Sequence, residues 1–222
     1  MIKGRISEIF TSLQGEGIYQ GLPQVFVRTF GCNLKCSFCD TRLTGYKEYS
    51  AGEIVEIIEG FNNNFHSLAL TGGEPLVQKE FLKRLLEKLK GPGWKIYLET
   101  NGTLPGSLEE IINWIDIVSV DLKLPSSTRL RGFWPEHKRF LEIASQADAF
   151  VKVVICNSTQ EEDVRRAVEL VADFNLPLVL QPNSFEMGNE LMGKARQFQE
   201  LCLSRLSDVR IICQMHKVMG LR

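Results

Sequence analysis

Apolar positions along the chain follow two spacings that alternate with one another. Short apolar or alternating runs predict strands, and apolar residues three or four positions apart predict helices. Strands are expected over 24–30, 67–71, 94–100, 115–123, 150–156, 178–181 and 209–213. Helices are expected after the capping box of Ser50 and Glu53, over 81–90, after Ser107 and Glu110, over 135–146, after Ser158 and Glu161, and over 191–206.

A strand followed by a helix, repeated about six times, predicts an α/β fold with a mostly parallel sheet. The length fits either a large α/β unit or a shortened barrel, and we treat 1–222 as a single domain. Polar clusters follow several strands: G-G-E-P, E-T-N-G, S-V-D-L-K and Q-P-N-S. In barrel-like α/β folds ligands bind at the carboxyl ends of the strands, so we expect these clusters to meet at one rim.

Composition and charge narrow the class of protein. The net charge is −1, from 26 basic and 27 acidic residues, which gives no electrostatic reason to bind nucleic acid. No apolar run approaches the length of a membrane span, and the first residues do not resemble a signal peptide. We therefore expect a cytoplasmic protein without a membrane partner. In that reducing compartment six cysteines favour metal binding or free thiols over disulfides.

The most informative stretch is G-C-N-L-K-C-S-F-C-D-T, residues 31–41. Cys32, Cys36 and Cys39 are spaced C-x3-C-x2-C, which lets three thiolates face one iron–sulfur cluster. A structural zinc site or unrelated buried thiols are the alternatives, although closed zinc sites need a fourth ligand. The other cysteines, Cys156, Cys202 and Cys213, stand singly among apolar residues, and we interpret them as core thiols.

Two glycine-containing segments flank this stretch. S-L-Q-G-E-G, residues 12–17, predicts a loop whose backbone can approach a ligand. T-G-G-E-P, residues 71–75, follows a predicted strand and offers backbone groups without Cβ interference. Each segment alone also fits an ordinary turn. Their combination with the cysteine spacing is much more specific.

Taken together, L-Q-G-E-G, C-N-L-K-C-S-F-C-D-T, T-G-G-E-P, E-T-N-G, L-Q-P and the terminal Q-x-H-K resemble the 7-carboxy-7-deazaguanine synthases. These are radical S-adenosylmethionine (SAM) enzymes of 7-deazapurine and queuosine biosynthesis. The resemblance covers essentially the whole chain and implies a partial TIM-like barrel that forms homodimers. It also implies conversion of 6-carboxy-5,6,7,8-tetrahydropterin to 7-carboxy-7-deazaguanine with loss of ammonia. In that reaction SAM is cleaved to methionine and a 5′-deoxyadenosyl radical, and it is regenerated.

The resemblance also implies roles for individual residues. A 4Fe-4S cluster would be bound by the three cysteines of the loop, and Thr41 would coordinate magnesium together with the substrate carboxylate. SAM would contact Phe38, Cys39, Asp40, Gly73, Ser119, Lys123, Gln181, Pro182, Asn183 and Ser184. The pterin would contact Leu13, Gln14, Gly15, Glu16, Arg28, Thr71 and the terminal carboxylate of Arg222.

Two other functions remain compatible with the cysteine spacing. A radical SAM activase that generates a glycyl radical on a partner protein has the same C-x3-C-x2-C spacing and a similar size. A zinc-binding structural or adaptor module is the non-enzymatic alternative. The pterin enzyme would draw electrons from a flavodoxin or ferredoxin. Whether the purified protein needs a pterin or a partner protein as its substrate separates the pterin enzyme from the activase.

Overall fold

The computed structural model describes residues 2–41, 43–61, 64–90 and 93–220. Within these ranges nine strands form one open sheet in the order β3-β1-β2-β4-β5-β6-β7-β8-β9. The strands are β1 (Lys3–Leu13), β2 (Pro23–Thr29), β3 (Lys47–Ser50), β4 (Ser67–Gly72), β5 (Ile96–Thr100), β6 (Ile117–Asp121), β7 (Asp148–Ile155), β8 (Leu178–Pro182) and β9 (Val209–Ile211).

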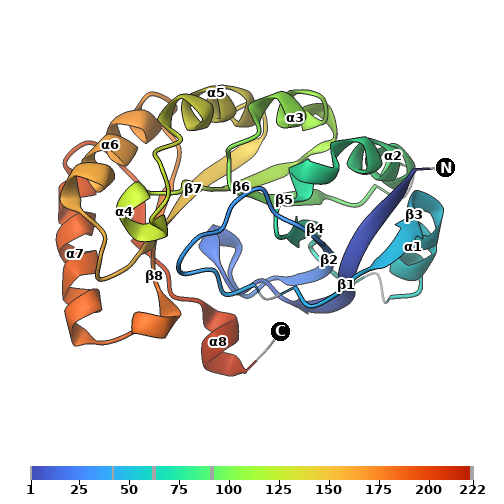
Figure 1. The fold of residues 1–222 in the computed structure, drawn as a ribbon, viewed down its shortest axis with the longest axis horizontal. Coiled ribbons are helices and arrows are strands. Elements are labelled where there is room, and N and C mark those ends of the chain that lie inside the picture. Colours follow the sequence, from blue (N-terminus) through green and yellow to red (C-terminus); the bar gives the residue numbers. More distant parts are fainter. Residues whose placement is uncertain (1, 42, 62–63, 91–92, 221–222) are drawn as a thin grey trace.

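Helices form an arc around the outside of the curved sheet (Figure 1). The main core lies between them and the strand residues that face outward, such as Val25, Leu68 and Val153, all of which are buried. The helices are α1 (Ala51–Glu59), α2 (Lys79–Leu89), α3 (Pro105–Glu109), α4 (Pro125–Thr128), α5 (Trp134–Ala144), α6 (Glu161–Ala172), α7 (Asn189–Leu203) and α8 (Met215–Met219), with short 3-10 turns at Gly17–Tyr19, Pro75–Gln78, Ile112–Trp114 and Ser184–Glu186.

From β2 onward every neighbouring pair of strands is parallel, which confirms the predicted mostly parallel sheet. Two strands were not expected from the sequence. β1 pairs antiparallel with β2, and β3 pairs antiparallel with the start of β1. Both lie on the side of the sheet where no helix intervenes between strands, so the strand–helix repeat that predicted the fold carries no signal for them.

Two of the expected helix caps are wrong. The helix expected to be capped at Ser107 begins earlier, at Pro105, because proline is pre-organised for the first helical turn. Ser158 does not cap α6, whose N-cap residue is Gln160. The hydroxyl of Ser158 donates instead to the carbonyl of Ser126, 2.8 Å away. By contrast, the Ser50 and Glu53 capping box is present as predicted.

Along the strands, the residues that face the inside of the curve change character from one end to the other. Nearer the amino ends they are apolar, and the 3-10 turn Gly17–Tyr19 and Ile212 pack against them and close this end. Toward the carboxyl ends the next inward residues are polar and line a cavity, so the fold itself creates a closed floor and an open polar rim. The pairs, inner apolar member first, are Phe26 and Arg28, Ala69 and Thr71, Tyr97 and Glu99, Ile117 and Ser119, Phe150 and Lys152, and Val179 and Gln181.

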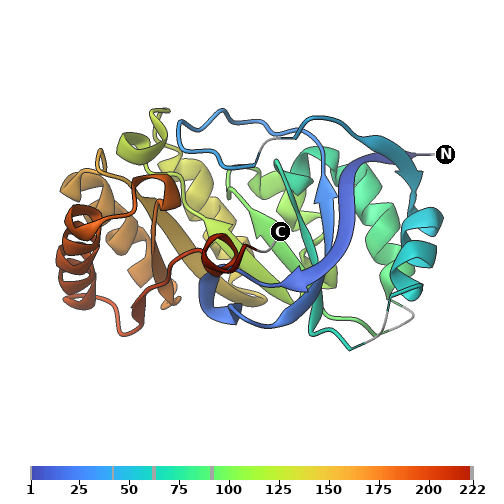
Figure 2. The same ribbon diagram turned by 90° about the horizontal axis from the view of Figure 1, so that it is seen from below.

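The carboxyl-terminal segment returns to the first strands. Viewed from below, α8 is seen end-on near the middle of the molecule, close to the dark-blue segment at the end of β1 (Figure 2). The amide of Met215 donates to the carbonyl of Gly15 at 2.8 Å. A Cβ on Gly15 would collide with the ring of His216, so this contact requires glycine. Among the described helices, none is both long and apolar enough to cross a membrane.

Candidate active site

A cavity of about 760 Å³ opens at the carboxyl ends of the parallel strands. It brings together nearly all of the residues that the sequence predicted for the site, from L-Q-G-E-G to Q-P-N-S. Pro182 does not line it, because it follows Gln181 on β8 and successive strand residues face opposite sides. Ser184, in the turn beyond β8, does not line it either, and Arg222 lies outside the described residues. The predicted residues in the lining are Leu13, Gln14, Gly15, Glu16, Arg28, Cys32, Cys36, Phe38, Cys39, Asp40, Thr41, Thr71, Gly73, Ser119, Lys123, Gln181 and Asn183.

The three loop cysteines reach this cavity together. The loop is held against α4, since the amide of Ser37 donates to the carbonyl of Thr128 at 3.1 Å and its hydroxyl to that of Ser127 at 2.9 Å. Burial raises the pKa of the Cys32 thiol and raises that of Cys36 to about 11. In the described part of the chain no other cysteine lines the cavity. Three sulfur ligands in one cavity, with no fourth cysteine among the described lining residues, fit an iron–sulfur cluster that leaves one iron open.

All six cysteines are free thiols. Cys156 and Cys202 are buried, which agrees with the prediction of core thiols. Cys213 is only partly buried, because it follows the short strand β9 at the edge of the sheet.

The G-G-E-P segment leads from β4 into the turn Pro75–Gln78 and packs against the start of the cysteine loop. Gly72 has a φ of +139°, and a Cβ on either glycine would collide with the backbone of Thr29 or Gly31. The glycines are therefore required by close packing of two chain segments, whereas the sequence suggested close approach of a ligand. Glu74 turns inward and is 1% exposed, and burial raises its pKa to about 7.

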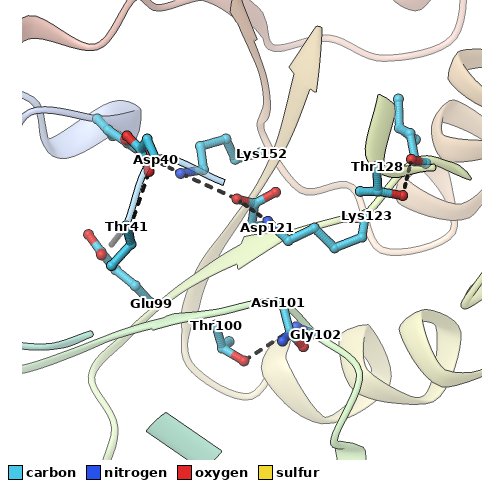
Figure 3. A network of polar contacts seen from close by, with 12 residues as sticks. Asp40, Thr41, Glu99, Thr100, Asn101, Gly102, Asp121, Lys123, Thr128 and Lys152 are labelled. Atoms are coloured by element: carbon cyan, nitrogen blue, oxygen red, sulfur yellow. Dashed lines mark hydrogen bonds and ion pairs between the residues drawn. The ribbon is translucent and has the colours of Figure 1, made fainter. Parts of the chain in front are cut away.

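A row of alternating charges crosses one wall of the cavity (Figure 3). The ammonium of Lys152 pairs with Glu16 and lies 3.6 Å from Asp121, which pairs with Lys123 at 2.8 Å. Burial opposes the charge on Glu16, but Lys152 outweighs it and lowers the pKa of that carboxyl overall. Lys123 also lies over the ring of Phe38, 5.3 Å from its centre. Lys123, which was predicted for the SAM site, therefore lies against the cysteine loop through Phe38.

A second group of lining residues offers directed hydrogen-bonding groups. The side-chain nitrogen of Gln14 donates to Gln24 and to Glu99, each at 2.9 Å, and the Thr71 hydroxyl donates to Glu99 at 2.6 Å. Arg28 lies at the edge of this wall, 3.5 Å from Glu8. The arrangement presents amide, carboxylate and guanidinium groups within one pocket, which suits a flat ligand with several polar edges.

Residues near the end of the chain complete the cavity. The side-chain nitrogen of Gln214 donates to Glu16 at 2.6 Å and to Asp40 at 3.0 Å, and Lys217 lies 3.3 Å from Asp40. Ligand atoms of Glu16, Asp40 and His216 lie within 4.8 Å of one another. The hydroxyl of Thr41 donates to Asp40 at 3.3 Å, so the predicted magnesium ligand stands next to further oxygen atoms.

Several residues in the lining were not among those predicted. Glu99, Asn101 and Asp121 belong to the strand-end clusters E-T-N-G and S-V-D-L-K without being assigned to the site, and Lys152 lies on the predicted strand 150–156. Their signal was present: each is a polar residue on a buried strand or immediately after one. Three residues near the carboxyl terminus also line the cavity: Gln214, His216 and Lys217. The sequence gives no signal for them, because their approach to Glu16 depends on tertiary structure.

Comparison with known proteins agrees with this geometry. The family model for the radical SAM superfamily matches residues 26–180. The cysteine loop, the sheet and this match define the class: the chain is a radical SAM enzyme.

The chain is 36% identical to the 7-carboxy-7-deazaguanine synthase of Geobacter sulfurreducens, over 97% of this chain and 96% of the relative. The enzyme of the same name from Methanospirillum hungatei is 42% identical, over 98% and 86%. The chain therefore belongs to the 7-carboxy-7-deazaguanine synthase family.

A solved structure supports the fold. The crystal structure of QueE from Escherichia coli superposes with a TM-score of 0.67 at 23% identity, covering 96% of this chain and 95% of that one. This likeness confirms the predicted α/β architecture with a partial barrel.

Proposed function

We propose that this chain converts 6-carboxy-5,6,7,8-tetrahydropterin to 7-carboxy-7-deazaguanine with loss of ammonia. The observation that carries the proposal is that the cysteine loop and the polar pocket around Gln14 open into one cavity. A cavity of about 760 Å³ is within the usual range for small-molecule sites and is large enough for more than one ligand.

Cys32, Cys36 and Cys39 would hold the cluster. When bound with SAM, it supplies one-electron reduction and a route to hydrogen-atom abstraction. The chain's own residues orient the ligands: Phe38 and Lys123 form one side of the SAM site, and Asp40 another. Gly73, Ser119, Gln181 and Asn183 also line this part of the cavity and would complete the SAM site, with Pro182 and Ser184 acting through the backbone of the same segment.

The pterin would lie against Leu13–Glu16, Arg28 and Thr71. A flat, amide-bearing heterocycle needs directed partners, because an unpaired buried polar group costs about 1–3 kcal/mol. Glu99, oriented by Gln14 and Thr71, supplies acceptor oxygens, and Arg28 supplies a planar cation for an anionic or carbonyl oxygen. Magnesium would bind at Thr41, since a hard cation prefers oxygen ligands and the Asp40 carboxylate lies beside that hydroxyl.

Partners and location follow from the same proposal. The cluster requires a one-electron donor, for which a flavodoxin or ferredoxin is suitable. We also propose a single-domain homodimer in the cytoplasm, where the six free thiols would remain reduced. Net charge gives no reason to invoke direct contact with nucleic acid.

The test is anaerobic incubation of the cluster-replete protein with reductant, SAM, magnesium and 6-carboxytetrahydropterin. Formation of 7-carboxy-7-deazaguanine supports the proposal. SAM cleavage without a deazaguanine product, in protein whose iron content is complete, rejects it and favours a protein substrate. A colourless protein that contains zinc would reject the cluster as well.

A further inference from the structure

Asn101, immediately after β5 in the E-T-N-G segment, is held through its backbone and its side chain. It is 5% exposed. Its backbone amide donates to Glu74 at 2.7 Å, and its carbonyl lies 3.1 Å from the Nε2 atom of His137, itself fully buried. Its side-chain oxygen accepts from the amide of Thr103 at 3.0 Å and from the Thr103 hydroxyl at 2.6 Å. This side chain therefore has one well-defined position.

The direction of the Asn101 amide follows from these contacts. A backbone N–H can only donate, so the side-chain oxygen must face Thr103 and the nitrogen must face the other way. On that side the nitrogen donates to the Oδ1 atom of Asn33 at 2.9 Å and lies 3.9 Å from the sulfur of Cys32. Asn101 thus directs an N–H donor toward the proposed cluster ligand Cys32, although the two residues are 69 positions apart in the sequence.

Cys32 differs from Cys39 in the kind of group that faces its sulfur. Its sulfur also receives the backbone amide of Leu34 at 3.4 Å. In the described part of the chain, the recorded contact of the Cys39 sulfur is with a carbonyl oxygen, that of Thr41, at 3.7 Å. Hydrogen bonds to cluster sulfurs are among the factors that set the reduction potential of an iron–sulfur cluster.

We propose that Asn101 raises the reduction potential of the cluster by donating an N–H to the Cys32 thiolate, with Asn33 and Thr103 as the residues that position it. This inference rests on the cluster proposed above. A donor to sulfur stabilises the reduced cluster more than the oxidised one, because the reduced cluster carries more negative charge. Asn101 would thereby make the cluster easier to reduce.

The test compares Asn101→Asp with Asn33→Asp in reconstituted holoprotein, by redox titration followed with electron paramagnetic resonance. In each variant a carboxylate oxygen takes the position of an amide atom 3.9 Å from the Cys32 sulfur, which is Nδ2 in Asn101 and Oδ1 in Asn33. Only Asn101→Asp removes the N–H donor that faces Cys32, and it keeps the acceptor that Thr103 needs, whereas Asn33→Asp removes a donor that faces Thr103. The charge effect is therefore matched, and the difference between the variants measures the hydrogen bond.

We expect the ratio of reduced to oxidised cluster at a fixed potential to be about tenfold lower in Asn101→Asp than in Asn33→Asp. For one electron this corresponds to about 59 mV. Equal potentials in the two variants would overturn the proposal. Iron content of the wild-type protein is measured first, so that failure of the cluster assignment is distinguished from failure of this inference.

A second measurement applies even if a variant does not fold or does not hold iron. Wild-type protein carrying ¹⁵N in its asparagine side-chain amides is reduced and examined by pulsed electron paramagnetic resonance. A ¹⁵N coupling to the cluster supports the contact from Asn101, whose nitrogen faces Cys32, whereas that of Asn33 donates to Thr103 at 2.9 Å. Absence of any ¹⁵N coupling would show that the donor does not reach the sulfur.

Discussion

The side-chain nitrogen of Gln214 lies 2.6 Å from the carboxylate of Glu16, although the two residues are 198 positions apart. Gln214 is buried, and it bridges Glu16 to Asp40. The contact joins the carboxyl-terminal segment to the loop after β1. Glu16 is ionised and lines the cavity, so this hydrogen bond holds the carboxyl-terminal segment against the cavity wall.

Replacing Gln214 with alanine should lower activity more than stability. Hydrogen bonds to charged groups contribute about 1.5–3 kcal/mol, so we expect a decrease of roughly one to two powers of ten in kcat/KM for the pterin. The matched control is Gln199→Ala, whose side chain donates to the Val209 carbonyl on the other side of the sheet. If both variants lose activity equally, Gln214 has no particular role at the site.

Lys152 should matter chiefly because it neutralises buried carboxylates. Lys152→Met leaves Glu16 and Asp121 without their shared cation, and breaking a buried pair destabilises a protein by about 3–5 kcal/mol. The double variant Glu16→Gln with Lys152→Met should recover most of that loss. Urea denaturation of the wild type, both single variants and the double variant measures the coupling. Simple additivity of the two single effects would contradict the pairing.

Arg28→Ala should separate pterin chemistry from SAM cleavage. The side chain lies in the cavity over the ring of Phe10, on a strand that ends next to the cysteine loop. We expect kcat/KM for the pterin to fall by roughly 10- to 100-fold, the effect of losing a charge-assisted contact. Slow uncoupled SAM cleavage should persist. Its loss would assign Arg28 to the SAM site or to folding.

Alanine at Cys32, Cys36 or Cys39 should abolish iron–sulfur absorbance and SAM cleavage. The control is Cys213→Ala, because Cys213 is a free, partly buried thiol that does not line the cavity. Iron content and visible absorbance are measured after anaerobic reconstitution. Comparable iron loss in the control would mean that the cluster assignment is wrong.

His137 should make stability depend on pH. Burial lowers its pKa from 6.5 to about 4, so the unfolded chain takes up a proton at a higher pH than the folded one. The stabilisation is complete above pH 6.5 and decreases as the pH falls toward 4. Between pH 6.5 and 5 the free energy of unfolding falls by roughly 1.5 kcal/mol from this group. In urea denaturation at both pH values, His137→Gln should show a correspondingly smaller decrease than the wild type.

The strand–helix repeat and the cysteine loop could be predicted because their signals are local. Spacing places Cys32, Cys36 and Cys39 in one loop, and strand ends bring Thr71 and Ser119 to one rim. β1 was not predicted, because its antiparallel pairing depends on a partner and its polar residues interrupt the apolar pattern. The roles of Lys152 and Gln214 depend on which charges lie opposite them, which no spacing in the sequence encodes.

The long separation between Glu16 and Gln214 in the sequence also sets the order in which the residues of the active site are synthesised. At the usual synthesis rate of roughly 5–20 residues per second, Glu16 precedes Gln214 by roughly 10–40 s. Lys152 appears within that interval, 136 positions after Glu16, and can neutralise it early. The cysteine loop and most of the parallel sheet therefore exist before the segment that covers the cavity has been made. The segment that completes the lining of the cavity is therefore the last part of the site to be made.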